Sequence, residues 1–470
     1  MSFNFVINLV CILHVVATTV SAIDCSNDPP VCPDDCRISL TVSIPEGLTY
    51  QSPIVHHLPT DISWKQIIDA TTDRLDLAAM YWTLRSVDVT PSDQSAKVGD
   101  EIFEKLVEIA KKGRHIRIAQ NVPGSMGDSD SALLQKLGLS TVRSLNLTRI
   151  LGGGVLHSKA WIGDQKHFYI GSANMDWRSL TQIKEMGVTG FNCSCLASDL
   201  HNIWLSYWYM ADPANPPLPS PWPESYSTCY NHSNPNVVRI NGTLSKVYLS
   251  SSPPKFKGDG RENDIDAITK LISEAQQFVH IAVMDYLPLA DFYSRNKQYR
   301  FWSVIDDALK SAAIDRGVSV KLLISYWNHT KFETIGFANS LIETGSTLKY
   351  RSGSIDVKFF QVPSNASQAE IPFARVNHNK YMVTENAAYI GTSNWIGDYF
   401  IDTAGIGFVV KPYNSEPNPL ITVAQDTFEQ DWNSKYAYRN CQGIVQPLSF
   451  TALLAAFLIA FSTFDLFTYE

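Results

Sequence analysis

The stretches LHSKAWIGDQKHFYIGSAN at residues 156–174 and NHNKYMVTENAAYIGTSN at residues 377–394 decide how this chain is organised. Each stretch places a lysine two residues after a histidine. Each then continues with Tyr-Ile-Gly, a hydroxyl residue and, two positions later, an asparagine. Ordered agreement of this kind within one chain indicates an internal repeat, in which each half folds into the same unit.

The patterns that precede these stretches also occur twice and in the same order. A helical pattern leads into an apolar strand, and a second helix and a second strand follow. The ranges are 62–72, 75–82, 102–112 and 116–119 in the first half, and 265–277, 278–286, 305–313 and 318–325 in the second. Alternating helices and strands predict an α/β fold of two repeated halves, each a mixed β-sheet flanked by helices. We expect the halves to pack around one shared site.

Length and composition agree with two units. A chain of 470 residues is too long for one ordinary core, and 45% hydrophobic with 18% charged residues excludes global disorder. The formal charge of −8 disfavours a surface built for non-specific nucleic-acid binding, although a small basic pocket stays open. The predicted divisions are a signal at 1–22, a first half at 23–211, a Pro-rich surface linker at 212–240, a second half at 241–446 and a hydrophobic tail at 447–470.

Both ends of the chain carry hydrophobic segments. Phe3 to Val20 is almost wholly apolar and is followed by the small residue Ala22, which is typical of a cleaved signal peptide or of an uncleaved signal anchor. Leu448 to Phe464 has no charged residue but is short for a spanning helix. It also suits a glycolipid-anchor signal or a helix packed on the domain. We therefore expect entry into the secretory pathway and membrane association.

Glycosylation sequons and cysteines support the secretory route. Six Asn-x-Ser/Thr sequons occur, at Asn146, Asn192, Asn231, Asn241, Asn328 and Asn365. Seven cysteines lie outside the predicted signal, an odd number that leaves one thiol free or bonded to another chain. Cys32 and Cys36 could pair with Cys193 and Cys195 as two disulfides. A zinc site is the alternative, but Cys-x-Cys lacks the usual two-residue spacing.

The residue types of the repeat suit binding and cleavage of a phosphodiester. His157 and Lys159 alternate in a strand-like segment, which places both side chains on one face, and His378 and Lys380 do the same. Together the halves supply two imidazoles, two ammonium groups and two carboxamides. The ammonium groups of Lys159 and Lys380 and the carboxamides of Asn174 and Asn394 are expected to neutralise the phosphate oxygens.

Two histidines permit a two-step displacement. One neutral imidazole attacks phosphorus and forms a phosphohistidine, while the other, protonated, gives its proton to the leaving oxygen and then activates water or an alcohol. The sequence contains no metal-ligand cluster, so we expect no cofactor and an activity that survives a chelator.

Three carboxylates accompany the motifs. Asp164 and Glu385 follow their histidines by seven residues and are interpreted as structural. Glu185 lies beyond the Asn174 loop in a strand-like context and is the better candidate to orient a histidine. The position that corresponds to Glu185 in the second half is Thr403, and the nearest carboxylate, Asp402, is one position away. This difference predicts that the two halves are chemically unequal.

The patterns His157-x-Lys159-x4-Asp164 and His378-x-Lys380-x4-Glu385 resemble the paired signatures of the phospholipase D superfamily. The Glu385 carboxylate departs from the usual aspartate. The strings SIPEGL (43–48), YWTL (81–84), VNHNKYMVTE (376–385) and AYIGTSNW (388–395) are similar to the animal branch of phospholipases D three and four. The resemblance implies a glycosylated endolysosomal 5′ exonuclease on single-stranded DNA and RNA. It also implies His157 as nucleophile and His378 as general acid, although the opposite order stays open.

Several alternatives remain at this stage. The same site could act on phospholipid as a phosphodiesterase or transphosphatidylase, making bis(monoacylglycero)phosphate, and a silent luminal binding protein is the third hypothesis. The location could be the endolysosomal lumen or membrane, or the protein could reach the cell surface or be secreted. One chain completes the site, so the chemistry does not require a homodimer and the oligomeric state is open. Four aromatic residues could stack on bases or belong to the core: Tyr81, Trp82, Trp177 and Tyr286.

Overall fold

The computed structural model describes residues 31–51, 53–123, 127–292, 298–349, 352–414 and 416–439. The predicted signal at 1–22 and the predicted tail at 447–470 lie outside these residues. None of the helices described within these ranges is long and apolar enough to cross a membrane.

Each half forms a mixed sheet, and the two strand orders match. The first sheet runs β6 (Thr141–Leu145), β5 (His115–Asn121), β3 (Arg74–Ala79), β7 (Ala160–Gly163), β8 (His167–Gly171), β10 (Glu185–Phe191), β1 (Asp35–Ser43). The second runs β19 (Ser354–Phe360), β18 (Ser319–Ser325), β14 (Phe278–Val283), β20 (Lys380–Thr384), β21 (Ala387–Gly391), β23 (Gly405–Pro412), β12 (Thr243–Ser252). In each sheet the first three strands are parallel and the others are antiparallel. This agreement confirms the predicted repeat.

Short strands complete and join the sheets. β11 (Asn236–Ile240) pairs with β12 and also with the start of β1, so it connects the halves. The remaining short strands are β2 (Leu58–Pro59), β4 (Trp82–Thr83), β9 (Met175–Asp176), β13 (Glu262–Asn263), β15 (Tyr286–Leu287), β16 (Leu289–Ala290), β17 (Arg300–Phe301), β22 (Trp395–Ile396) and β24 (Ala437–Tyr438).

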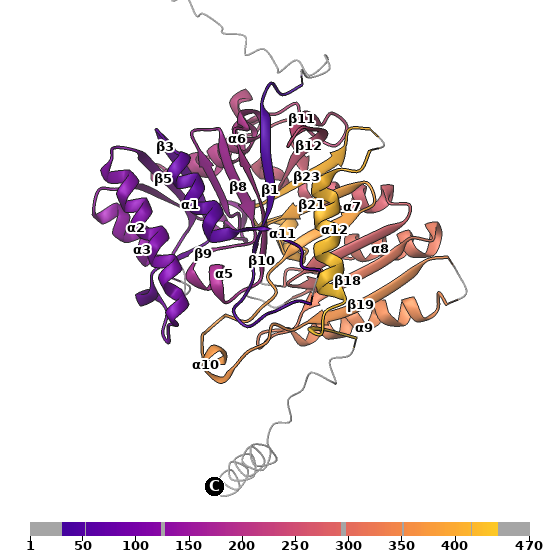
Figure 1. Ribbon diagram of the computed structural model, residues 1–470. Coiled ribbons are helices and arrows are strands. Elements are labelled where there is room, and N and C mark those ends of the chain that lie inside the picture. Colours follow the sequence, from indigo (N-terminus) through magenta and orange to yellow (C-terminus); the bar gives the residue numbers. More distant parts are fainter. Residues whose placement is uncertain are drawn as a thin grey trace, which may run out of the picture.

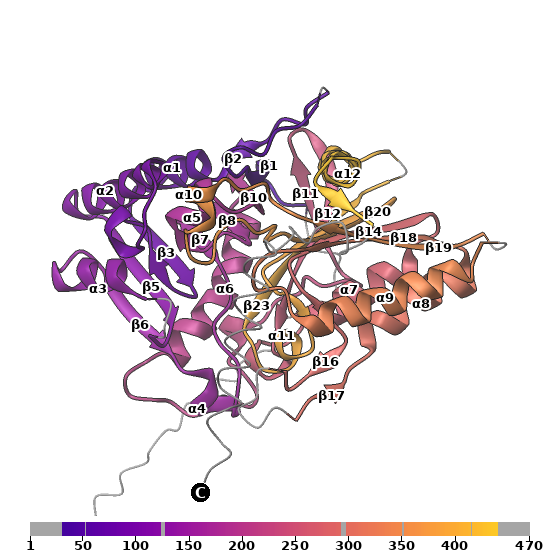
Figure 2. The same ribbon diagram turned by 90° about the horizontal axis from the view of Figure 1, so that it is seen from below.

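Helices cover both faces of each sheet (Figures 1 and 2). On the first sheet, α1 (Thr60–Ala70) and α2 (Lys97–Lys111) lie opposite α6 (Ser194–Met210). On the second, α7 (Asp264–Glu274) and α8 (Val304–Arg316) lie opposite α12 (Pro419–Trp432). The other helices are α3 (Ser129–Lys136), α4 (Leu147–Leu151), α5 (Trp177–Thr181), α9 (Phe332–Ser346), α10 (Ala366–Ala369) and α11 (Asp398–Ile401).

The period of two along each strand divides its side chains between separate cores. In β3, Leu75 and Leu77 pack against α1 and α2, while Ala78 faces the core that both halves share. In that shared core the rings of Phe168 from β8 and Phe408 from β23 lie 6.4 Å apart. The halves are thus joined by a common hydrophobic interior that holds the site in place.

Three details differ from the sequence predictions. His157 to Lys159 lie just before β7 rather than in a strand. The strands predicted at 75–82 and 278–286 each break, because β4 and β15 leave the sheet to pair with β9 and β22 after the two asparagine loops. The predicted linker is not free surface chain: Trp222 is buried, its indole N–H donates to the Lys255 carbonyl at 3.1 Å, and residues 236–240 form β11.

Disulfides attach the start of β1 to the start of α6. The bonds join Cys32 to Cys195 and Cys36 to Cys193, with Cα separations of 6.2 Å and 4.6 Å. Cys229 is also disulfide-bonded. The predicted disulfides are confirmed, and these four sulfurs are not available as zinc ligands.

Candidate active site

The two histidine segments reach the same place because each pairs with the other half. The His157 amide donates to the Ala404 carbonyl at 2.9 Å, directly before β23. Symmetrically, the His378 amide donates to the Lys184 carbonyl at 2.8 Å, directly before β10. Each histidine is therefore placed by a backbone bridge from the opposite half.

Glycines before His157 permit this close approach. A Cβ added at Gly153 or Gly154 would collide with Asp402, the residue before Thr403 in the second half. The run Gly152 to Gly154 thus serves contact between the halves. This contact explains the glycine run without a close approach of substrate to the backbone.

Both lysines take the same position beside their histidines. The Lys159 ammonium donates to the His157 carbonyl and the Lys380 ammonium to the His378 carbonyl, each at 2.6 Å. Burial lowers the pKa of Lys159 well below its ordinary value and that of Lys380 to about 7. The site therefore gathers two buried amines beside the two histidines, and an anionic substrate group would favour their charged form.

The tautomer of His157 follows from its partner. Nδ1 lies 2.8 Å from the Thr392 carbonyl, which can only accept, so Nδ1 carries the proton and Nε2 presents a lone pair. Burial, followed by the charges of Lys159 and Lys380, lowers the pKa of His157 well below 6.5. His157 is therefore a neutral imidazole with a free Nε2.

His378 has a different partner. Its Nδ1 lies 2.8 Å and 3.0 Å from the two oxygens of Glu185, which also accepts a hydrogen bond from the Ser172 hydroxyl. Burial, followed by the charges of Lys380 and Lys159, lowers the pKa of His378, and burial raises the pKa of Glu185 to about 7. The buried pair therefore shares one proton across the Nδ1–carboxyl hydrogen bond. Thr403, the matching position in the second half, contacts the Val155 amide instead.

The two asparagines of the repeat, Asn174 and Asn394, are both buried. The Asn394 amide donates to Asp285 at 3.3 Å and to the Tyr399 hydroxyl at 3.1 Å. Oδ1 of Asn174 and of Asn394 is buried and has no hydrogen-bond partner among the described residues. Sequence reasoning missed Asp285, whose pKa burial raises to about 6. The available signal was a charged residue two positions after the end of the apolar strand β14.

Comparison with known proteins places this site in a family. The chain matches the family model described as PLD3/4, PLD-like domain, over residues 53–365. It is 44% identical over 409 residues to the 5′-3′ exonuclease PLD3 of Xenopus laevis, covering 86% of this chain and 81% of that protein. The chain belongs to this phospholipase D family. The predicted fold class and enzyme class, a phosphodiesterase of the phospholipase D superfamily, are confirmed.

Other relatives span similar lengths. Identity is 42% over 411 residues to the 5′-3′ exonuclease PLD3 of Homo sapiens, covering 87% of this chain and 82% of that protein. Identity is also 42% to a probable phospholipase D of Caenorhabditis elegans, covering 86% of this chain and 71% of that protein. The solved phosphatidylserine synthase of Haemophilus influenzae has a TM-score of 0.54 at 12% identity, covering 95% of this chain and 94% of its own, and shares the fold.

The acidic residues of the family signature lie away from the histidines. Asp164 accepts hydrogen bonds from the amides of Thr72, Asp73 and Arg74 at 2.6–3.0 Å. Glu385 accepts from the amides of residues 276–278 at 2.7–3.3 Å. In both halves this carboxylate holds the turn between a helix and the next strand of this phospholipase D fold.

The remaining predicted residues lie outside the site. Tyr81, Trp82, Trp177 and Tyr286 are buried in the cores, so the base-stacking reading of these four is wrong. None of the six sequon asparagines is buried, and their glycosylation stays a prediction.

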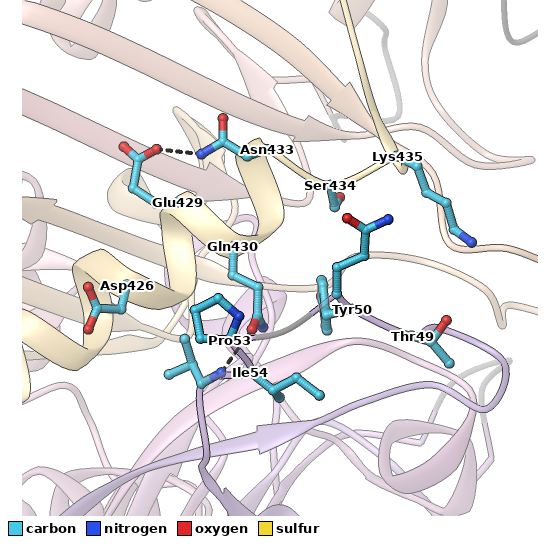
Figure 3. Close-up of a pocket in the computed structure, with 12 residues that line it drawn as sticks. Thr49, Tyr50, Pro53, Ile54, Asp426, Glu429, Gln430, Asn433, Ser434 and Lys435 are labelled. Carbon is cyan, nitrogen blue, oxygen red and sulfur yellow. Dashed lines mark hydrogen bonds between the residues drawn. The ribbon is translucent and has the colours of Figure 1, made fainter.

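A separate groove of about 900 Å³ lies between residues 49–51 and 53–55 on one side and the end of α12 on the other (Figure 3). There the Val55 amide donates to Gln430 at 2.9 Å, which holds the N-terminal segment against the helix. The groove contains none of the paired-motif residues, so it is not part of the active site.

Proposed function

We propose that this protein removes nucleotides from the 5′ end of single-stranded DNA or RNA through a covalent phosphohistidine. Its relatives at 42–44% identity over most of the chain carry the name 5′-3′ exonuclease. The observation that carries the mechanism is the difference between the two histidines. His157 faces a carbonyl that leaves Nε2 unprotonated, while His378 faces the carboxyl of Glu185.

In the first step, Nε2 of His157 attacks phosphorus. The P–N bond forms, the bond from phosphorus to the leaving oxygen breaks, and Nε2 of His378 gives its proton to that oxygen. Lys159 and Lys380, with Asn174 and Asn394, bind the non-bridging oxygens as their charge changes. Glu185 stabilises the protonated form of His378 before the transfer.

In the second step, the neutral His378 takes a proton from water. The water oxygen attacks phosphorus, the P–N bond breaks, and His157 returns to its starting state. No step in this scheme uses a metal ion or a cofactor.

We also propose an acidic lumen of the secretory pathway, such as the endolysosome, as the location. Disulfides at four described cysteines and six unburied sequons support an oxidising, glycosylating route. The hydrophobic tail at 447–470 supports membrane association.

The second candidate is phospholipid headgroup transfer, in which an alcohol replaces water in the second step. The Caenorhabditis elegans relative named a probable phospholipase D favours it at 42% identity. A lysophosphatidylglycerol transfer assay tests this candidate directly.

The deciding experiment is degradation of single-stranded oligonucleotides with 5′-hydroxyl and 5′-phosphate ends at about pH 5, with chelator present. We expect stepwise loss from the 5′-hydroxyl end that His157→Ala and His378→Ala both abolish. A strict requirement for a divalent ion would contradict the mechanism. No cleavage by folded protein would move the assignment to phospholipid.

A further inference from the structure

The loop 326–331 and the segment 373–377, of which Phe373 is exposed and the rest buried, meet beside His378. The last residue of β18, Ser325, accepts a hydrogen bond from the Asn377 amide at 3.1 Å. The loop 326–331 therefore leaves β18 next to the residue that precedes His378. The segment 373–377 arrives at the same point from the other direction.

Aromatic side chains from these segments form an exposed stack. The rings of His329 and Phe373 lie 4.8 Å apart with an interplanar angle of 16°. Trp327 packs edge-on against His329 at 4.7 Å. His329 is exposed and Phe373 is 45% exposed, unlike the buried aromatic residues near the asparagine loops. The His329 and Phe373 side chains of this stack are therefore accessible to solvent.

The backbone around the exposed residue Phe373 is conformationally strained. Phe373 has φ of 55°, and Arg375 has φ of 56°, a region that non-glycine residues seldom occupy. The Arg375 guanidinium compensates by donating to the Gln182 side chain at 3.0 Å and to the Glu46 carbonyl at 2.7 Å. An exposed aromatic residue kept in a strained conformation by buried hydrogen bonds indicates a functional position.

The stack lies within reach of the reaction centre. Phe373 precedes His378 by five residues, and an extended chain spans at most about 3.3–3.6 Å per residue, so the two lie within roughly 18 Å. Burial raises the pKa of Asp285 in the site, and Lys331, at the end of the same loop, is near enough for its charge to offset part of that rise. A chain with a phosphate at His378 can therefore place a nearby base on these rings.

We propose that His329 and Phe373 form a base-stacking subsite for single-stranded nucleic acid, one or a few nucleotides from the cleaved bond. Stacking is tolerant of sequence, since every base has a π face, and a lipid headgroup has none. This inference rests on the proposed exonuclease function and names how that substrate is held. The predicted glycan at Asn328 borders the subsite, so the glycosylated protein is the one to test.

The test measures binding of a 3′-labelled single-stranded oligonucleotide by fluorescence anisotropy, in full-length His157→Ala protein. Adding Phe373→Ala is expected to weaken binding about 5- to 150-fold, the range for loss of one stacked base, while Phe373→Tyr retains it. Phe332→Ala is the matched control. Phe332, the first residue of α9 directly after the loop, is 84% exposed and has no ring contact among the described residues. Equal melting temperatures exclude misfolding.

An abasic series locates the contact. One abasic nucleotide near the 5′ end should weaken binding to the His157→Ala protein and have no further effect once Phe373→Ala is present. Three outcomes would each overturn the proposed subsite. The His157→Ala protein could fail to bind the oligonucleotide detectably, Phe373→Ala could bind as tightly as Phe332→Ala, or the abasic effect could be fully additive with that of Phe373→Ala. The unsubstituted protein could instead bind the oligonucleotide with an affinity that depends on Phe373 and yet fail to cleave it. That result would contradict the exonuclease proposal and leave the subsite standing.

Discussion

At the scale of single residues, the two histidines differ in what faces their Nδ1 atoms. A carbonyl faces His157, and a carboxyl shared with Ser172 faces His378. A carbonyl fixes a tautomer, whereas a carboxylate also stabilises a positive charge. The repeat therefore supplies two similar imidazoles, and one side chain from the opposite half makes them unequal.

Glu185→Gln should lower kcat about 10²- to 10⁴-fold, because the amide keeps a hydrogen bond but cannot stabilise protonated His378. The loss should shrink for a p-nitrophenyl phosphodiester, whose leaving group needs no proton. Kinetics with both substrates check this. An equal loss on both would show that Glu185 has only a structural role.

The pH dependence follows from the same buried groups. The pKa of Glu185 is raised to about 7, so the proton shared with His378 is held below that pH and lost above it. Lys380, with its pKa lowered to about 7, loses its charge over the same range. Both effects predict that kcat/KM for an oligonucleotide falls as pH rises through about 7, with folded protein confirmed at each pH. Activity that increases from about pH 7 to about pH 9 would contradict this assignment.

At the scale of elements, the acidic residues of the signature are turn-holding groups. Asp164 links the turn after β7 to the residues between α1 and β3, and hydrogen bonds with the Thr72, Asp73 and Arg74 amides lower its pKa. Its contribution to stability is therefore present above the ordinary pKa and is lost as pH falls through the lowered value.

Asp164→Ala should lower the free energy of unfolding by about 1–3 kcal/mol and leave kcat/KM of the folded enzyme within about twofold. Thermal melts and kinetics on the same preparation measure both effects. Glu385→Ala should behave alike in the second half. A large kcat loss without destabilisation would instead place these carboxylates in the chemistry.

At the scale of the whole molecule, the active site exists because the halves interlock. Val155 and His157 pair with Ala404, and Lys184 pairs with Val376 and His378. The shared core behind these bridges fixes the spacing of the two imidazoles. Catalysis should therefore be sensitive to contacts between the halves that touch no substrate.

Gly154→Ala tests this sensitivity. Its Cβ would strike the Asp402 backbone, so we expect a shift of His157 and a kcat loss of about tenfold or more. Gly152→Ala is the control, because Gly152 also has a positive φ but has open space where a Cβ would go. Equal losses in both variants would assign the effect to backbone strain alone.

The sequence alone was enough to predict the repeat, the α/β class, the paired histidines, lysines and asparagines, and Glu185 as the group beside a histidine. These features are local, since helix and strand periodicities and the order of motif residues are written along the chain. Thr403 stands where the first half has Glu185, and this difference also predicted that the two halves would be chemically unequal.

Only the tertiary structure decided which histidine Glu185 meets and that a backbone carbonyl serves the other. It also decided that Asp285 joins the site, that four aromatic residues are core, and that His329 and Phe373 form the exposed stack. Each of these depends on contacts between residues far apart in the chain, and loop closure and packing of the two sheets set such contacts. A local pattern predicts which side of an element a residue occupies, but it does not predict what lies opposite.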